Sequence, residues 1–175
     1  MHRRIEMAFI EKFLGQRVEI PDNRRYDVKQ GLWGKRVDET IVFGLTQPAL
    51  ILLGGVKDMD TLVQENQEVR RGQSILFVIT GKILYLEAPV AGNIFFNKIV
   101  KEDPFSIARD PYEQGWLFLI KPEGGSDQSY KSLAAPGTYI ESLRCSEGFR
   151  NPEGLKGGVS GICKAVYTGI RDQKI

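Results

Sequence analysis

The sequence is poor in the residues that most often build catalytic and metal sites. Its 175 residues include one histidine, His2, and two cysteines, Cys145 and Cys163. One histidine near a chain end argues against Ser-His and Cys-His nucleophile pairs and against a multi-histidine metal centre. Neither cysteine has a close cysteine or histidine neighbour in the sequence, so zinc or iron–sulfur ligation would need a second chain. We therefore expect two buried, reduced thiols, with Cys163 the more deeply buried.

Long apolar runs and an excess of charge of one sign are also missing. The densest apolar run, 49–53, is far too short to cross a membrane. The segment that follows Arg3 and Arg4 is interrupted by charges and lacks the apolar core of a signal peptide. The formal net charge is only +2, and the basic residues are scattered rather than grouped with aromatics. The sequence therefore predicts a cytoplasmic protein that binds neither nucleic acid nor a membrane.

The chain has the composition of one compact globular unit, with 42% hydrophobic and 26% charged residues. We divide it into an N-terminal helical appendage (1–23), a motif-bearing core (24–122) and a C-terminal extension (123–175). In the appendage, a helix is expected from Ile5 to Leu14, because its apolar residues fall on one helical face. Gly15 would end this helix.

Short strands separated by frequent glycine and proline dominate the core. Residues 37–43 predict two short strands around a turn. Thr46 is a suitable N-cap, and Pro48 suits the first turn of a short helix over 47–53. The pattern predicts a mostly β fold, a flattened barrel or sandwich of two hairpin-rich halves, with Gly92 at a turn of the second half.

A hairpin with a lysine at its turn is the most informative feature of the chain. The apolar runs 75–79 and 83–86 flank Thr80, Gly81 and Lys82. Glycine suits the first central position of a two-residue type II′ turn, where φ is positive. We therefore expect Gly81 and Lys82 as the central pair, with Lys82 presented to solvent. Carrier domains hold a lysine in this way to bear a swinging prosthetic group, whereas a solvated lysine in an ordinary hairpin is the alternative.

Five short motifs, in order and at about the right spacing, resemble those of the H protein of the glycine cleavage system. The resemblance covers roughly residues 26–122. It implies the flattened lipoyl/biotinyl-type barrel-sandwich hybrid fold for residues 24–122. The motifs are GLWGK (31–35), FGLT (43–46), QPALILLG (47–54), APVAGNIFFN (88–97) and DPYEQGWLFLIKP (110–122).

The resemblance implies a non-catalytic carrier with lipoate in amide linkage to Lys82. Such a carrier would take an aminomethyl group from glycine decarboxylase and pass it to an aminomethyltransferase. Dihydrolipoyl dehydrogenase would reoxidise it, and a lipoate ligase or transferase would load it. Biotin is a weaker option, because the family-typical Ala-Met-Lys-Met is absent around Lys82.

The chain departs from the H-protein pattern around this lysine. In the family the lipoyl lysine lies in Glu-Ser-Val-Lys-Ala-Ala-Ser-Asp. Counting forward from Gly72 places Lys82 at the lysine's position, whereas counting back from Ala88 places it one residue off. Lipoyl-attaching enzymes are understood to read the hairpin's shape and the acidic residue three positions before the lysine, and that residue is Ile79 here.

A second hypothesis is a carrier fold without a cofactor that serves in binding or scaffolding. The hairpin strands are apolar on both faces, and a bare apolar patch marks an interaction surface. The C-terminal extension is too rich in large apolar residues for a disordered tail. We expect part of it to pack back on the core near the Lys82 hairpin and to shield the tip. The apolar residues are Tyr139, Ile140, Leu143, Phe149, Leu155, Val159, Ile162, Val166 and Tyr167.

Overall fold

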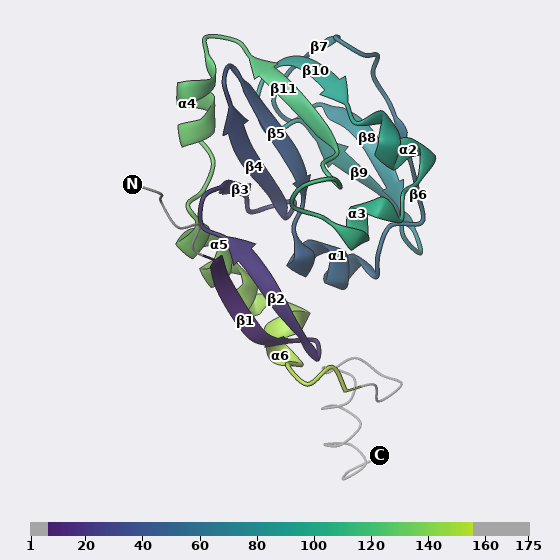
Figure 1. Ribbon diagram of the computed structural model, residues 1–175, viewed down its shortest axis with the longest axis vertical. Helices are drawn as coiled ribbons and strands as arrows, with labels where there is room; N and C mark the ends of the chain where they lie inside the picture. The colour runs from purple at the N-terminus through teal and green to yellow at the C-terminus, as the bar shows by residue number, and fades with distance from the viewer. Residues whose placement is uncertain (1–6, 156–175) are drawn as a thin grey trace.

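The computed structural model describes residues 7–155 of the chain (Figure 1). The fold is mostly β, as predicted, with several antiparallel sheets and short helices, and it is not a closed barrel. The largest sheet has the strand order β3-β4-β5-β11-β10-β7. Its strands are β3 (Arg25–Asp27), β4 (Leu32–Val37), β5 (Thr40–Leu45), β7 (Glu68–Val69), β10 (Gly92–Phe96) and β11 (Phe118–Pro122).

A second sheet has the order β6-β8-β9, and it supplies the other half of the main core. Its strands are β6 (Asp58–Thr61), β8 (Ser74–Ile79) and β9 (Ile83–Glu87). Phe43 and Phe118 of the large sheet belong to the same buried cluster as Val78 and Leu86 of the small one. The two sheets therefore share one apolar interior, as expected for a flattened sandwich of two halves.

The helix predicted over 47–53 is present as α1 (Gln47–Leu53). The Thr46 side chain accepts a hydrogen bond from the Ala49 N–H at 3.1 Å, and Pro48 occupies the first turn. Gly54 ends the helix in the left-handed region at φ 77°. The remaining helices are α2 (Lys98–Glu102), α3 (Ser106–Arg109), α4 (Ser126–Lys131), α5 (Pro136–Ser142), the 3₁₀ helix η1 (Leu143–Cys145) and α6 (Glu147–Arg150).

The prediction of a helix from Ile5 to Leu14 is wrong for residues 7–14, which are the part of this segment that the structure describes. The chain instead forms a β-hairpin of β1 (Met7–Phe13) and β2 (Gln16–Pro21). Leu14 and Gly15 both have positive φ, 51° and 81°, which is the type I′ geometry that matches strand twist. Gly15 is therefore a hairpin turn residue rather than a helix end.

The described part of the C-terminal extension packs on the core, as predicted, but not over the hairpin tip. Tyr139 of α5 stacks on Tyr26 with ring centroids 4.8 Å apart. Phe149 of α6 packs edge-on against Phe13 of β1, so α6 and the β1–β2 hairpin lie side by side in Figure 1. At the tip, the side chains of Ile83 and Tyr85 are 55% and 56% exposed. Some of the residues named in the predictions lie outside the described part of the chain, namely Val159, Ile162, Cys163, Val166 and Tyr167.

Two further single-residue predictions are wrong. Gly92 begins β10 and is paired with both Pro122 and Val69, so it lies inside the sheet rather than at a turn. A glycine is required there because its φ is 153° and a Cβ would lie 2.1 Å from the Lys121 carbonyl oxygen. Cys145, expected to be buried, is exposed at the end of η1.

Three buried tyrosines predict that the fold loses stability in alkaline solution. Burial raises the pKa of Tyr139 to about 12, and it also raises the pKa values of Tyr26 and Tyr112. An unfolded tyrosine ionises near pH 10, so the stabilisation is complete below that pH and is lost as the pH rises through 10 towards 12. The loss is at most about 1.4 kcal/mol per pH unit for each tyrosine.

Urea unfolding between pH 8 and pH 11.5 measures this loss. We expect the free energy of unfolding to fall above pH 10. In a Tyr139→Phe variant it should fall less steeply, because one of the three buried tyrosines no longer contributes to the slope. The same slope in the variant and the parent chain would contradict a role for Tyr139.

Candidate functional site

The β8–β9 hairpin carries Lys82 in its turn, as predicted. Ile79 faces Ile83 across the two strands, so the loop consists of Thr80, Gly81 and Lys82. The Thr80 N–H donates to the Lys82 carbonyl oxygen at 2.9 Å and closes the loop. The predicted two-residue type II′ turn is therefore wrong. Gly81 does not have the positive φ which that turn requires, and it occupies the middle of a three-residue loop.

The Lys82 side chain is exposed, and its amine has no hydrogen bond or ion pair to any described residue. Among the described residues, the lysines that form ion pairs are Lys12, Lys29, Lys101, Lys121 and Lys131. Lys82 is also the only lysine between Ser74 and Glu87. Its amine is accordingly open to acylation, on a loop whose two ends are fixed by paired strands.

The outer face of this hairpin is apolar. Ile79 lies opposite Ile83, and Phe77 lies opposite Tyr85 with ring centroids 6.1 Å apart. On the other side of β8, Asp58 of β6 lies opposite Ile79, and Asp60 of β6 lies opposite Phe77. The residue three positions before Lys82, Ile79, thus stands on the outer face, where a carboxylate would also have access to solvent.

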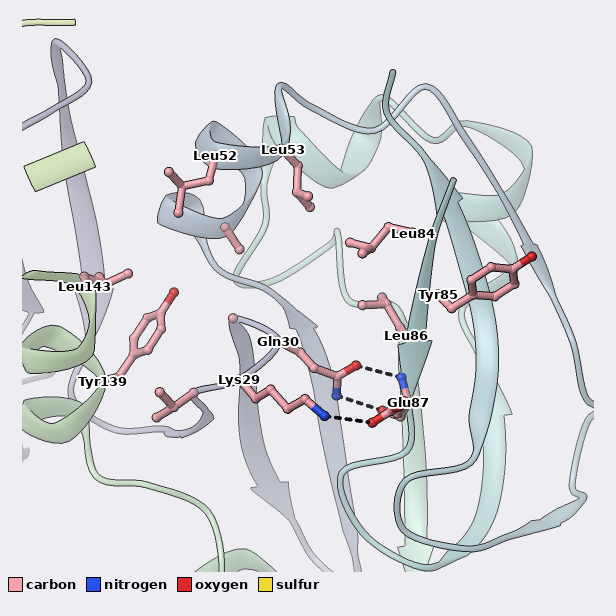
Figure 2. Close-up of a pocket in the computed structure, with 13 residues that line it drawn as sticks. Lys29, Gln30, Leu52, Leu53, Leu84, Tyr85, Leu86, Glu87, Tyr139 and Leu143 are labelled. Carbon is pink, nitrogen blue, oxygen red and sulfur yellow. Dashed lines mark hydrogen bonds and ion pairs between the residues drawn. The ribbon is translucent and has the colours of Figure 1, made fainter. Parts of the chain in front are cut away.

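A mostly apolar pocket of about 390 Å³ runs beside β9, between this strand, α1 and α5 (Figure 2). Leu52 and Leu53 come from α1, and Tyr139 and Leu143 come from the C-terminal helices. In Figure 2 the Leu84 side chain points towards the pocket, whereas the Tyr85 ring points away from it. The C-terminal segment therefore supplies one wall of this pocket, opposite the strand that follows Lys82.

Polar groups gather at the end of the pocket that lies away from Lys82. The Gln30 side-chain amide accepts from the Glu87 N–H at 2.7 Å and donates to the Glu87 carbonyl oxygen at 3.0 Å. Lys29 Nζ lies 3.7 Å from the Glu87 carboxylate. These two charged side chains pair with each other, and most of the remaining lining residues are apolar.

The wall formed by α5 is held to α1 through Tyr139. Its hydroxyl lies 2.5 Å from the hydroxyl of Thr46, the same residue that caps α1. Sequence reasoning expected Tyr139 to pack on the core but did not bring Gln30 or Lys29 to the hairpin. Gln30 and Glu87 are 57 residues apart, and no local pattern joins them.

The described residues contain no group of three or more histidine, cysteine, aspartate or glutamate side chains that could hold a metal ion. Within residues 7–155, no helix is long and apolar enough to cross a membrane.

Comparison with known proteins gives consistent results. The family model described as glycine cleavage H-protein matches residues 24–145. The chain is 32% identical over 127 residues to a glycine cleavage system H protein from Anaeromyxobacter sp. (strain K), covering 71% of this chain and 98% of that protein. It is 31% identical over 128 residues to a glycine cleavage system H protein from Thermus thermophilus, covering 72% of this chain and 97% of that protein.

A solved structure shows the same arrangement. The crystal structure of a glycine cleavage system H protein from Mycobacterium marinum superposes with a TM-score of 0.59 at 28% identity. The match covers 70% of this chain and 97% of the other.

Proposed function

The chain belongs to the glycine cleavage H-protein family, and from this premise we propose that it is a non-catalytic carrier with lipoate in amide linkage to Lys82. The observation that supports this proposal most directly is the placement of Lys82. It is the one lysine of a three-residue hairpin loop, its side chain is exposed, and its amine is unpaired among the described residues.

The residues around Lys82 fit an acylated lysine. Amide formation removes the positive charge of the amine, and Lys82 has no carboxylate partner in the described part of the chain that would be left unpaired. The loop itself is closed by the main-chain bond from Thr80 to Lys82, so its shape does not depend on the lysine side chain. When attached, lipoate supplies a disulfide that can be reduced and can bear a transferred group.

The hairpin provides a rigid base for such an arm. Val78 and Leu86, on the inner face of β8 and β9, are almost fully buried in the main core. A flexible arm on a fixed base raises the local concentration of its reactive end at each partner. The chain's own contribution is therefore to position and present the arm, not to catalyse a reaction.

The partners follow from the family proposal. They are glycine decarboxylase, which would supply the aminomethyl group, an aminomethyltransferase, dihydrolipoyl dehydrogenase, and a lipoate ligase or transferase. We propose the cytoplasm as the compartment in which the carrier meets them.

One observation favours a second candidate function, a carrier fold used as an unlipoylated binding or scaffold protein. Ile79 takes the place of the acidic residue that precedes the family lysine, and beside it Ile83 and Tyr85 are more than half exposed. An apolar surface of this kind suits a protein partner.

Intact mass separates the two candidates. The protein is purified from its native host grown with lipoate, and the modified peptide is located by fragmentation. We expect one lipoyl increment, at Lys82. An unmodified chain, in cells whose other lipoyl proteins are fully loaded, would contradict the carrier proposal and favour the scaffold.

A further inference from the structure

One edge of the β6-β8-β9 sheet has unpaired main-chain groups. The Lys82 carbonyl oxygen accepts from Thr80, and Ala88 bonds to Gln73 and Gly72, so the main-chain groups of these even-numbered residues face β8. Successive residues of a strand alternate in direction. The N–H and C=O groups of Ile83, Tyr85 and Glu87 therefore face the free edge of β9. At Ile83 and Tyr85 no other described segment bonds to them.

The edge is already paired at one end, by a side chain. The amide of Gln30 both accepts from and donates to the main chain of Glu87, at 2.7 and 3.0 Å. This is the pair of bonds that a residue of a neighbouring antiparallel strand would make. Figure 2 shows these bonds at the far end of β9, below Leu84 and Leu86. The edge is thus oriented for strand pairing, and two residues of it, Ile83 and Tyr85, are left open.

The surroundings of the open edge fit a polypeptide. The 390 Å³ pocket lies alongside it, so alternate side chains of an added strand would enter the space between Leu84, Leu52 and Leu53. The charge at the two ends differs. Glu87 is paired with Lys29, whereas Lys82 at the tip end is exposed and forms no ion pair within the described residues.

We propose that the free edge of β9 binds an extended segment of a partner protein, which adds to the sheet as a further strand. The segment would be apolar at alternate positions, with those side chains in the pocket, and would carry an acidic residue at the end that meets Lys82. Main-chain pairing supplies the affinity and the pocket supplies the selectivity. The partner would then be held next to the residue that bears the arm. The main-chain pairing does not depend on lipoylation of Lys82, whereas the contact with the acidic residue requires a free Lys82 amine.

The test uses the full chain, without lipoate, and a synthetic peptide. The probe is an acetylated and amidated heptapeptide of alternating valine and threonine with glutamate at its last position, which an antiparallel strand places next to Lys82. We expect saturating peptide to slow amide hydrogen exchange of Ile83 and Tyr85 at least tenfold. The Leu84 amide, which faces β8, serves as the internal control and should not change.

A matched pair of variants isolates the main-chain donor. Tyr85→Pro removes an N–H that faces away from β8, and an edge strand tolerates proline in that position. Tyr85→Ala removes the same side chain but keeps the N–H. We expect Tyr85→Pro to weaken peptide binding at least tenfold and Tyr85→Ala to weaken it less than threefold. In Gln30→Ala, peptide-dependent protection should extend to the Glu87 amide.

A second probe keeps the proposal testable if Tyr85→Pro does not fold. Two further peptides carry N-methyl groups on alternate residues, one on the odd-numbered and one on the even-numbered residues. Each of them lacks the N–H donors along one edge of the strand and cannot pair through that edge. We expect one of these two peptides to lose binding to the parent chain. Equal binding of all three peptides, or no slowing at Ile83 and Tyr85, would overturn the proposal. If, without peptide, amide exchange at Ile83 and Tyr85 becomes slower as the protein concentration rises, the edge binds a second copy of the chain, and the proposal is overturned as well.

Discussion

Deleting residues 124–175 is expected to lower the free energy of unfolding by about 5 kcal/mol or more. The described part of this segment buries Leu133, Tyr139 and Leu143 almost completely. Each large apolar side chain of this kind contributes about 1.5–3 kcal/mol when buried. Because a whole domain is stable by only about 5–15 kcal/mol, the loss takes about a third of the stability or more.

The deletion should also uncover apolar surface. Tyr139 and Leu143 form one wall of the pocket beside β9, and Tyr139 covers the ring of Tyr26. We expect increased binding of an apolar fluorescent dye together with the lower stability in urea. A shorter deletion from residue 147 is the matched control. It keeps Leu133, Tyr139 and Leu143 and removes the half-buried Phe149, so it should cost less.

An unchanged unfolding midpoint and no gain in dye binding after the long deletion would show that the segment is a separate appendage. A long and a short deletion with equal losses would place the stabilising contacts after residue 146, contrary to the packing of α5.

The core of the fold could be predicted because its signals are local. Thr46 followed by Pro48 specifies the start of α1 through a side-chain cap and a fixed φ, and neither depends on distant residues. The hairpin at Lys82 was recognised from two apolar runs around Gly81. The five ordered motifs then located the H-protein-like domain, which the family match and the solved relative support.

The N-terminal hairpin was missed because one apolar pattern fits two structures. Phe9 and Phe13 are four residues apart, which suits one face of a helix, and Gly15 suits a helix end. The deciding signal lay further along the chain. Val18 and Ile20 alternate with polar residues, as in a strand that is buried on one face, and both are fully buried in the structure. Read together with this strand, Leu14 and Gly15 are a hairpin turn.

The turn at Lys82 and the pocket were not predictable from local sequence, for two different reasons. Strand pairing sets Ile79 opposite Ile83, and this register leaves three loop residues, so the conformation of Gly81 follows from the ladder rather than from glycine's preference. The pocket is assembled from α1, β9 and α5, and from the contact of Gln30 with Glu87. Such contacts between distant segments arise only in the folded chain.

The loop geometry also bears on the departure from the family pattern around the lysine. Counting back from Ala88 puts the family's lysine at Gly81, which is the middle residue of the loop, whereas Lys82 is the third. The amine of Lys82 is nonetheless on the exposed tip, and no other lysine lies on the two strands. If this hairpin is modified on a lysine, it is modified at Lys82.

Replacing Lys82 with arginine is therefore expected to abolish lipoyl attachment completely. Arginine keeps the charge and the length of the side chain but has no amine that can form the amide. Lys82 is exposed and makes no described contact through its amine, so the free energy of unfolding should change by no more than about 0.5 kcal/mol. Intact mass after expression in a lipoate-replete host, with unfolding in urea, measures both effects.

Lys57→Arg is the matched control, because Lys57 is a second exposed lysine at the same end of the sheet, bonded through its N–H to Ile79. It should keep full lipoyl attachment. A third variant, Ile79→Glu, restores the acidic residue three positions before the lysine on an outer face that can accept a charge. Since lipoyl-attaching enzymes are expected to read that residue, we expect the modified fraction to rise whenever the parent chain is only partly loaded. Lipoyl attachment that persists in Lys82→Arg, or that is lost in Lys57→Arg, would contradict the assignment of Lys82 as the carrier residue.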